Sequence, residues 1–373
     1  MEPTIPVLLD AILAKAVALK ASDIHLEPRE EYIRVRYRVD GLLTDDKPVH
    51  KSQQAAIISR VKILVDLDIA ESRQPQDGRT NLKINKQELD LRVSTLPTLH
   101  GEKIVIRLLN RQHALLPLEA LGLSAENLNA YRQMIAQRCG IILVTGPTGS
   151  GKTTTLYATL ASLNQREVNI TTIEDPIEYQ LPGINQVQVN QKAGLTFARG
   201  LRSILRQDPD IVMVGEIRDL ETAQIAFQAA LTGHLVFSTL HTNNAAAAVT
   251  RLVDMGIDRY LVEASIIGVM AQRLVRIITP KGYAGRTGIY EIMSGITPLK
   301  EMRTMLDDGL SKVEKGITTK EEIGRVIFLD SPAATSSSTS SSPTTAATGR
   351  TASSPALSTS TISASTTQTL TAF

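Results

Sequence analysis

The sequence predicts an α/β protein with a parallel β-sheet in its larger domain and a smaller α+β domain in front of it. Apolar runs alternate with helical stretches in the second half, as is typical of a parallel sheet that helices cover on both faces. These runs span residues 141–144, 168–173, 211–214 and 235–239. The first half instead mixes strands of alternating polarity with isolated helices, which favours an α+β domain.

The smaller domain is predicted to span residues 1–112, and its elements follow from the spacing of apolar residues. Such residues recur at helical intervals at the N-terminus, which predicts an amphipathic helix with the apolar face Ile5, Leu8, Leu9, Ile12, Leu13 and Ala16. Residues 32–39 alternate between apolar and polar side chains, and the pair Asp40-Gly41 predicts a turn after them. We also expect a helix over 52–65 and strands over 82–84, 88–93 and 103–109.

Residues 113–140 are predicted to lead into the larger domain, through a linker near 113–117 and a helix over 115–138. The larger domain is predicted to span residues 141–330 and to end in helices. Residues 331–373 consist almost entirely of Ser, Thr, Ala and Pro, and Arg350 is their one charged side chain. A segment of this composition buries too little apolar surface to offset its chain entropy, so we expect it to be disordered.

The composition excludes several classes of protein. A formal charge of +2 and an aromatic content of 3% argue against the basic grooves and stacking platforms of nucleic-acid channels. Cys139 is the sole cysteine, so neither an internal disulfide nor a multi-cysteine zinc site is expected. The N-terminus lacks a signal-peptide pattern, and Glu263, Arg273 and Arg276 interrupt the apolar stretch 261–278. We therefore expect a soluble cytoplasmic protein without direct membrane insertion.

A phosphate-binding loop is predicted at residues 146–153, which read Gly-Pro-Thr-Gly-Ser-Gly-Lys-Thr and match G-x-x-x-x-G-K-[ST]. An apolar run precedes it and a helical stretch follows, which is the strand–loop–helix order that such loops require. Backbone N–H groups would surround the phosphates at the positive end of the helix. We expect Lys152 to reach the β- and γ-phosphates and the Thr153 hydroxyl to hold Mg²⁺. The predicted nucleotide-binding residues of this segment are Gly146, Pro147, Thr148, Gly149, Ser150, Gly151, Lys152, Thr153 and Thr154.

Two acidic clusters follow predicted strands of the larger domain. Glu174, Asp175 and Glu178 come after the second apolar run, and Glu216 comes after the third. Ligands bind at the carboxyl ends of parallel strands, so these side chains are placed to hold Mg²⁺ or to position water. Glu174 and Asp175 are predicted to contact the nucleotide, and Glu216 is predicted to hold Mg²⁺. Helix capping and surface charge are the alternative explanation for the first cluster.

His234 and His241 stand at either end of the fourth apolar run. A single buried histidine usually has a structural role, and this explanation stays open for both. Two histidines beside a nucleotide site are also candidates for sensing the γ-phosphate, because the imidazole ring can donate a hydrogen bond to it.

Together these motifs resemble those of the secretion ATPases, which power type II secretion, type IV pilus assembly and competence pseudopili. The loop, the two acidic clusters and the histidine pair are similar to the Walker A, Asp-box, Walker B and His-box segments of that family. Segments on both sides resemble further family signatures: 21–28 (ASDIHLEP), 73–79 (RQPQDGR), 271–276 (AQRLVR) and 285–291 (GRTGIYE). The resemblance covers nearly all of residues 21–326.

The resemblance implies a RecA-like ATPase core, a PAS-like N-terminal domain and a homohexamer at the inner face of the cell membrane. It implies ATP and Mg²⁺ as ligands, with Glu178 and Glu216 sharing water activation and Mg²⁺ positioning. Arg92 and Arg107 fall where the family places arginines that reach the γ-phosphate, and arginine also suits bidentate phosphate contacts. A solvated strand face is the alternative for both arginines. The implied catalytic set is Glu178, Glu216, Arg92, Arg107, His234 and His241.

Two departures from the family pattern concern zinc and docking. Family members commonly carry a four-cysteine zinc segment between the motifs at 271–276 and 285–291. Here residues 277–281 bridge that gap without cysteines, so no zinc is expected. The sequence starts just before Ala21, so the docking domain of long members is not expected either. An inner-membrane platform protein is the implied partner.

Three alternative functions stay open beside an assembly motor. The first is a DNA-translocating or helicase-type ATPase, which the near-neutral charge and the scarcity of aromatic residues disfavour. The second is a pilus retraction motor, which would differ in its partner more than in its chemistry. The third is a degenerate scaffold that binds nucleotide without turnover, which the intact Lys152, Glu178 and Glu216 disfavour.

Overall fold

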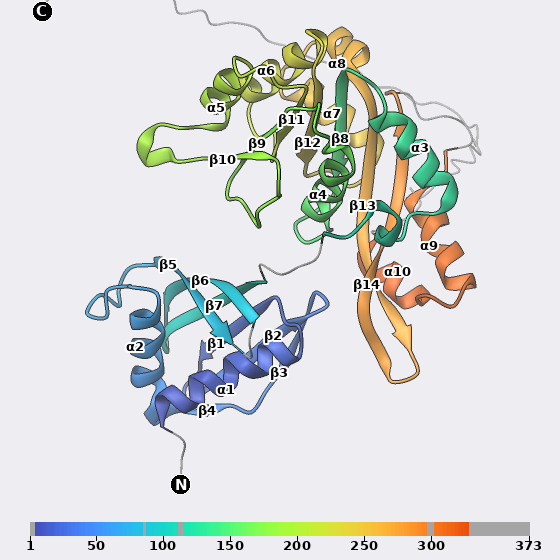
Figure 1. The fold of residues 1–373 in the computed structure, drawn as a ribbon. Helices are drawn as coiled ribbons and strands as arrows, with labels where there is room; N and C mark the ends of the chain where they lie inside the picture. Colours follow the sequence, from blue (N-terminus) through green and yellow to red (C-terminus); the bar gives the residue numbers. More distant parts are fainter. Residues whose placement is uncertain (1–3, 85–86, 111–114, 297–301, 328–373) are drawn as a thin grey trace, which may run out of the picture. The chain divides into compact units, whose positions relative to one another are not determined.

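Strands of two kinds divide the structure into two sheets. The computed structural model describes residues 4–84, 87–110, 115–296 and 302–327, and these form two seven-stranded sheets (Figure 1). In the first sheet, long strands alternate between buried and more exposed positions. In the second, several strands are buried at every residue. Alternation indicates a sheet with one covered face, and continuous burial indicates a sheet covered on both.

The first sheet buries one face under two helices. Its elements are α1 (Ile5–Ala18), β1 (Asp23–Pro28), β2 (Tyr32–Val39), β3 (Leu42–Asp45), β4 (Val49–His50), α2 (Gln54–Leu64), β5 (Gln76–Ile84), β6 (Gln87–Thr98) and β7 (Gly101–Asn110). The strand order is β3-β2-β1-β7-β6-β5, with β4 beside β2 and all neighbours antiparallel. Apolar side chains of α1, α2 and the strands share one core. The expected α+β domain is confirmed.

The second sheet is mostly parallel. Its strands are β8 (Gly140–Thr145), β9 (Ile170–Glu174), β10 (Asn185–Gln188), β11 (Ile211–Val214), β12 (Leu235–Leu240), β13 (Ile266–Thr279) and β14 (Gly282–Ser294). The order is β10-β9-β11-β12-β8-β13-β14, and only β14 runs antiparallel to its neighbour. Figure 1 shows β13 and β14 extending beyond the other strands.

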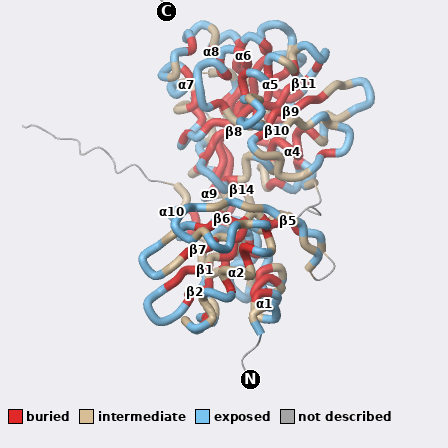
Figure 2. The backbone as a smooth tube through the Cα atoms, turned by 90° about the vertical axis from the view of Figure 1, so that its left-hand side faces the viewer, coloured by how far each residue is buried: buried red, intermediate tan, exposed pale blue. Residues whose placement is uncertain are grey.

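Helices cover both faces of the second sheet, as the apolar runs predict. Its helices are α3 (Ala125–Ile135), α4 (Lys152–Leu163), α5 (Phe197–Ile204), α6 (Leu220–Leu231), α7 (Ala245–Asp254), α8 (Arg259–Ser265), α9 (Met305–Glu314) and α10 (Lys320–Val326). Side chains of α3 and α4 pack on one face. Those of α5 to α10 pack on the other. Figure 2 shows the buried strands beneath more exposed helices and loops.

Two sequence expectations differ from the structure. The single helix expected over 115–138 is wrong: a short 3₁₀ helix (Leu118–Leu121) is separated from α3 because Gly122 adopts φ 87° and Ser124 caps α3. The apolar stretch 261–278, for which the sequence predicted no element, comprises most of α8 followed by most of β13. The strand expected over 82–84 is the last part of the longer β5.

The predicted domain division stays a prediction. The first sheet ends with Asn110 and the second begins with Gly140. Residues 111–114 of the expected linker, and the segment 331–373 that we expect to be disordered, lie outside the described residues. No helix in the described ranges is both long and apolar enough to cross a membrane.

Candidate nucleotide site

Residues 146–151 form a loop between the end of β8 and the start of α4, which confirms the predicted strand–loop–helix order. Two of the glycines in this loop show why that residue type is needed. Gly146 has φ 151°, and a Cβ atom there would lie 2.6 Å from the carbonyl oxygen of Gln272. Gly151 has φ 91° and directly precedes the first residue of α4. A larger residue at either position would strain the backbone, so glycine lets the loop turn tightly into the helix.

The side chain of Lys152 folds back onto the first residues of the loop. Its ammonium group donates hydrogen bonds to the carbonyl oxygens of Gly146 (2.8 Å) and Pro147 (3.1 Å). Burial, aided by the charge of Arg273 and opposed by Glu216, lowers the pKa of Lys152 to about 8. A phosphate beside this ammonium group would favour its charged form, because an opposite charge raises the pKa of a lysine.

The loop fits the phosphates of a magnesium-bound nucleotide on several observations. The Ser150 hydroxyl is buried and has no hydrogen-bond partner among the described residues. The first N–H groups of α4 have no partner within the helix, so they and the helix dipole offer an anion site at the loop. Thr153, in the first turn of α4, is exposed, so its hydroxyl is accessible to a cation.

Gln272 on β13 braces the loop from the neighbouring strand. Its side-chain amide donates to the carbonyl oxygen of Ser150 (2.7 Å), and its Oε1 accepts from the hydroxyl of Thr155 (2.9 Å). Sequence reasoning did not assign Gln272 to the site. The signal that could have found it is a polar amide within an apolar stretch, because such a group is buried only with partners.

Glu216 and His241 meet at the carboxyl ends of β11 and β12. His241 Nε2 lies 3.5 Å from Glu216 Oε2, and Arg218 Nη2 lies 2.5 Å from Glu216 Oε1. Burial lowers the pKa of His241, so its ring is mostly neutral at pH 7. Thr242 shares a hydrogen bond of 2.7 Å with Thr145, the last residue of β8. This bond holds the segment with His241 beside the strand that leads into the loop.

Glu178 lies beyond the end of β9, where it is partly buried. Arg92 Nη1 lies 3.4 Å from Glu178 Oε2. Burial raises the pKa of Glu178 although Arg92 and Arg107 favour its charged form. A carboxylate with a raised pKa is suited to accept a proton. Asp175 is exposed and close enough for its charge to act on Arg218.

Glu174, which the sequence predicts to contact the nucleotide, is buried at the end of β9. Its carboxylate is buried and accepts hydrogen bonds from the Tyr157 hydroxyl, the Thr172 hydroxyl (2.6 Å) and the Gln186 amide (3.1 Å). These donors belong to α4, β9 and β10. The carboxylate therefore joins three elements of the core, and a contact between Glu174 and the nucleotide stays a prediction.

The structure does not bring His234 to the loop. His234 precedes β12, and its backbone oxygen accepts from Gly140 at the start of β8. Its Nδ1 lies 2.9 Å from the carbonyl oxygen of Ala229. The six residues of β12 separate it from His241, a length of roughly 20 Å at about 3.3 Å per residue. Within one chain, His234 therefore has a structural contact at the far edge of the sheet.

Three arginines, which we call the arginine row, lie side by side on the first sheet. Arg92 on β6 stands directly opposite Arg79 on β5 and Arg107 on β7. Arg107 Nε donates to Asp23 Oδ1 on β1 at 3.0 Å. Sequence reasoning named Arg92 and Arg107 but missed Arg79. Only the strand register shows that the three arginines are neighbours, although Arg79 is the last residue of the family-like motif at 73–79.

The sequence matches one protein family over most of its length. A family model described as "Type II/IV secretion system protein" matches residues 1–325. The chain belongs to this family. The type II secretion system ATPase E of Vibrio cholerae is 48% identical over 374 residues, covering 86% of this chain and 74% of that protein. The type II secretion system protein HxcR of Pseudomonas aeruginosa is 51% identical over 358 residues, covering 86% and 76%.

A solved structure of a family relative shows the same fold. The pilus retraction motor PilT, described with bound ADP, is 30% identical with a TM-score of 0.63, covering 85% of this chain and 96% of that one. The RecA-like core with a preceding domain is confirmed, and the chain is an ATP-hydrolysing enzyme. A retraction motor is not better supported, because the relatives named for type II secretion are more similar in sequence.

Proposed function

We propose that this ATPase powers a type II secretion system by coupling ATP hydrolysis to assembly of a pseudopilus. The support from sequence is the identity of 48% and 51% to two proteins named for type II secretion. The observation that carries the chemistry is the convergence of Lys152, Glu216 and His241 at the carboxyl edge of the second sheet. Type IV or competence pilus assembly would use the same chemistry with another partner.

In this proposal the loop binds the triphosphate. Backbone N–H groups at the start of α4 and the ammonium group of Lys152 contact the phosphate oxygens. Thr153 and Glu216 would hold Mg²⁺, which neutralises charge on the β- and γ-phosphates when bound. Arg218, which forms an ion pair with Glu216, would hold that carboxylate in position.

Two carboxylates and one histidine prepare the attacking water. Glu178 and Glu216 share water activation and Mg²⁺ positioning, and the raised pKa of Glu178 makes it suited to accept the proton. A neutral His241 can donate one hydrogen bond toward the γ-phosphate while its other ring nitrogen accepts. Its contact with Glu216 would couple the state of the phosphate to the carboxylate.

The first sheet completes the site with positive charge. Arg92 and Arg107 would contact the γ-phosphate as charge develops on its oxygens, because guanidinium groups match phosphate geometry. The active form would be a homohexamer in the cytoplasm at the inner face of the membrane, acting on an inner-membrane platform protein.

ATP turnover by a Lys152→Ala variant tests this proposal. We expect wild-type protein to release phosphate from ATP and the variant to lose that activity with an unchanged circular dichroism spectrum. Lys192→Ala, which removes an exposed lysine of the same domain, is the control and should keep wild-type turnover. If Lys152→Ala hydrolyses ATP at the wild-type rate, residues 146–153 are not the site of hydrolysis.

A further inference from the structure

The arginine row belongs to one line of charged residues across five strands. From β5 to β2, Arg79 stands opposite Arg92, Arg92 opposite Arg107, Arg107 opposite Asp23, and Asp23 opposite Arg38. Directly opposite residues project from the same face with Cβ atoms roughly 5 Å apart. The apolar core with α1 and α2 lies on the other face. Three like charges are therefore neighbours on the face that those helices leave uncovered.

Carboxylates are distributed unevenly along this line. Asp23 is buried and pairs with Arg107 at 3.0 Å. Arg92 has a carboxylate oxygen of Glu178 at 3.4 Å. Arg79 is exposed and forms no ion pair with any residue that the structure describes. Because like charges placed opposite each other destabilise a sheet, Arg79 opposes Arg92 without a carboxylate of its own to offset the repulsion.

A cavity of about 530 Å³ lies over the arginine row. Its charged lining residues are Arg79, Arg92, Arg107 and Asp77, so positive charge predominates. The volume is within the range of roughly 300–1,000 Å³ that small-molecule sites occupy. Guanidinium groups present planar pairs of donors that match phosphate oxygens, and this cavity brings three of them together.

We propose that Arg79 is a third arginine that contacts the phosphates of ATP, beside Arg92 and Arg107. The proposal rests on the proposed function, because it requires the arginine row to meet the nucleotide during hydrolysis. Arg107 forms an ion pair with Asp23, and Arg92 forms one with Glu178. Arg79 therefore brings a charge that no described carboxylate has neutralised, and this charge acts on the oxygens where negative charge develops.

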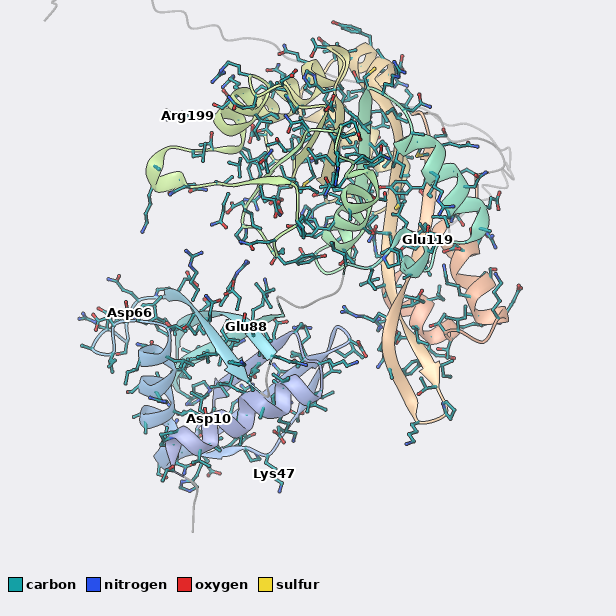
Figure 3. The ribbon with its side chains drawn as sticks, viewed as in Figure 1. Asp10, Lys47, Asp66, Glu88, Glu119 and Arg199 are labelled. Carbon is teal, nitrogen blue, oxygen red and sulfur yellow. The ribbon has the colours of Figure 1, made fainter. Side chains whose placement is uncertain are left out.

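The test compares Arg79→Gln with Lys83→Gln in the full chain. Lys83 is an exposed cation on the same face of β5, and it stands opposite Glu88, which Figure 3 labels on β6. We expect Arg79→Gln to lower kcat by about tenfold with KM changed by less than about twofold. We expect Lys83→Gln to match wild type. Arg79→Lys should fall between the two, because it keeps the charge but loses the paired donors.

Thermal unfolding separates a phosphate contact from a structural role. Removing a like-charge repulsion should leave the Tm of Arg79→Gln unchanged or about 1 °C higher. A Tm several degrees below wild type, with full kcat regained by Arg79→Lys, would show that Arg79 stabilises the sheet and would overturn the proposal. Equal kcat values for Arg79→Gln and wild type would also overturn it.

The wild-type and Lys152→Ala proteins separate this inference from the function on which it rests. If wild type and Lys152→Ala release phosphate at the same rate, the proposed function fails. If wild type is active, Lys152→Ala is inactive and Arg79→Gln matches wild type, only the role of Arg79 fails.

Discussion

The phosphate loop and the arginine row serve the same proposed reaction, yet they are built in opposite ways. The loop follows the carboxyl end of β8, in a sheet that is buried on both faces, and its donors are backbone N–H groups and one lysine. The arginine row lies on the uncovered face of a one-sided sheet, and its donors are all side chains. One group of donors is fixed by the fold, and the other by rotamers and ion pairs.

This difference predicts a division of work. The backbone donors of the loop contact phosphate oxygens that carry charge in the substrate as well as in the transition state, so they contribute to binding both. Long guanidinium side chains on an open face lose rotamer entropy when they are fixed. Contacts strong enough to offset this loss are expected where charge develops in the transition state. We therefore expect the loop to govern nucleotide binding and the arginine row to govern turnover.

The largest effect is expected at the carboxylate beside the loop. Glu216→Gln removes the charge that would hold Mg²⁺ and that pairs with Arg218 and His241. We expect kcat to fall on the order of 10³-fold while ATP still binds. Steady-state phosphate release and equilibrium binding of a non-hydrolysable ATP analogue measure the two quantities.

Glu167→Gln is the control for this variant, because Glu167 is an exposed glutamate of the same domain. It should retain wild-type kcat. Turnover by Glu216→Gln within twofold of wild type would show that this carboxylate takes no part in the reaction.

The pH dependence of kcat/KM tests the lysine of the loop. The pKa of Lys152 is lowered to about 8 by burial, so the free enzyme loses this charge as the pH rises through 8. We expect kcat/KM to fall by about tenfold per pH unit above that value. The value of kcat should fall less, because bound phosphate restores the charge. A flat kcat/KM from pH 8 to 9.5 would contradict a phosphate contact by Lys152.

The two histidines are expected to give the smallest effects and the clearest contrast between the two ends of one strand. His241→Ala removes a ring beside Glu216 and should lower kcat by about tenfold. His234→Ala removes a contact at the opposite end of β12 and should leave kcat within about twofold of wild type. Steady-state turnover of both variants decides the matter. Equal losses of kcat in the two variants would contradict this expectation, because within one chain His234 lies at the end of β12 opposite to His241.

Much of the fold could be predicted from polarity patterns alone. Fully buried strands such as β8 and β12 show as unbroken apolar runs, and the alternation in β2 shows a strand with one exposed face. The prediction of one helix over 115–138 was wrong because Gly122, in the left-handed region, ends a 3₁₀ helix and Ser124 then caps the start of α3. β13 was missed because polar residues within it resemble interruptions rather than contacts across the sheet.

The candidate site was predictable where its residues are contiguous. The loop is one unbroken motif, so its residues could be named directly. Gln272 could not be named, because its partner Ser150 is distant in sequence and only the pairing of β13 with β8 brings them together. Arg79 was hidden for the same reason, since strand register is a tertiary property. The buried contacts of Glu174 and the distance of His234 from the loop could not be predicted, because a motif does not say which way a side chain turns.

The most direct test of the division between loop and row is the Arg92→Gln variant. We expect kcat to fall by about 10²-fold, less than the 10³–10⁵ of a lone arginine, because Arg79 and Arg107 remain. The dissociation constant for a non-hydrolysable ATP analogue should stay within about threefold of wild type. A dissociation constant about 10²-fold higher, with kcat at saturating ATP unchanged, would contradict this account. The arginine row would then hold the nucleotide without accelerating its hydrolysis.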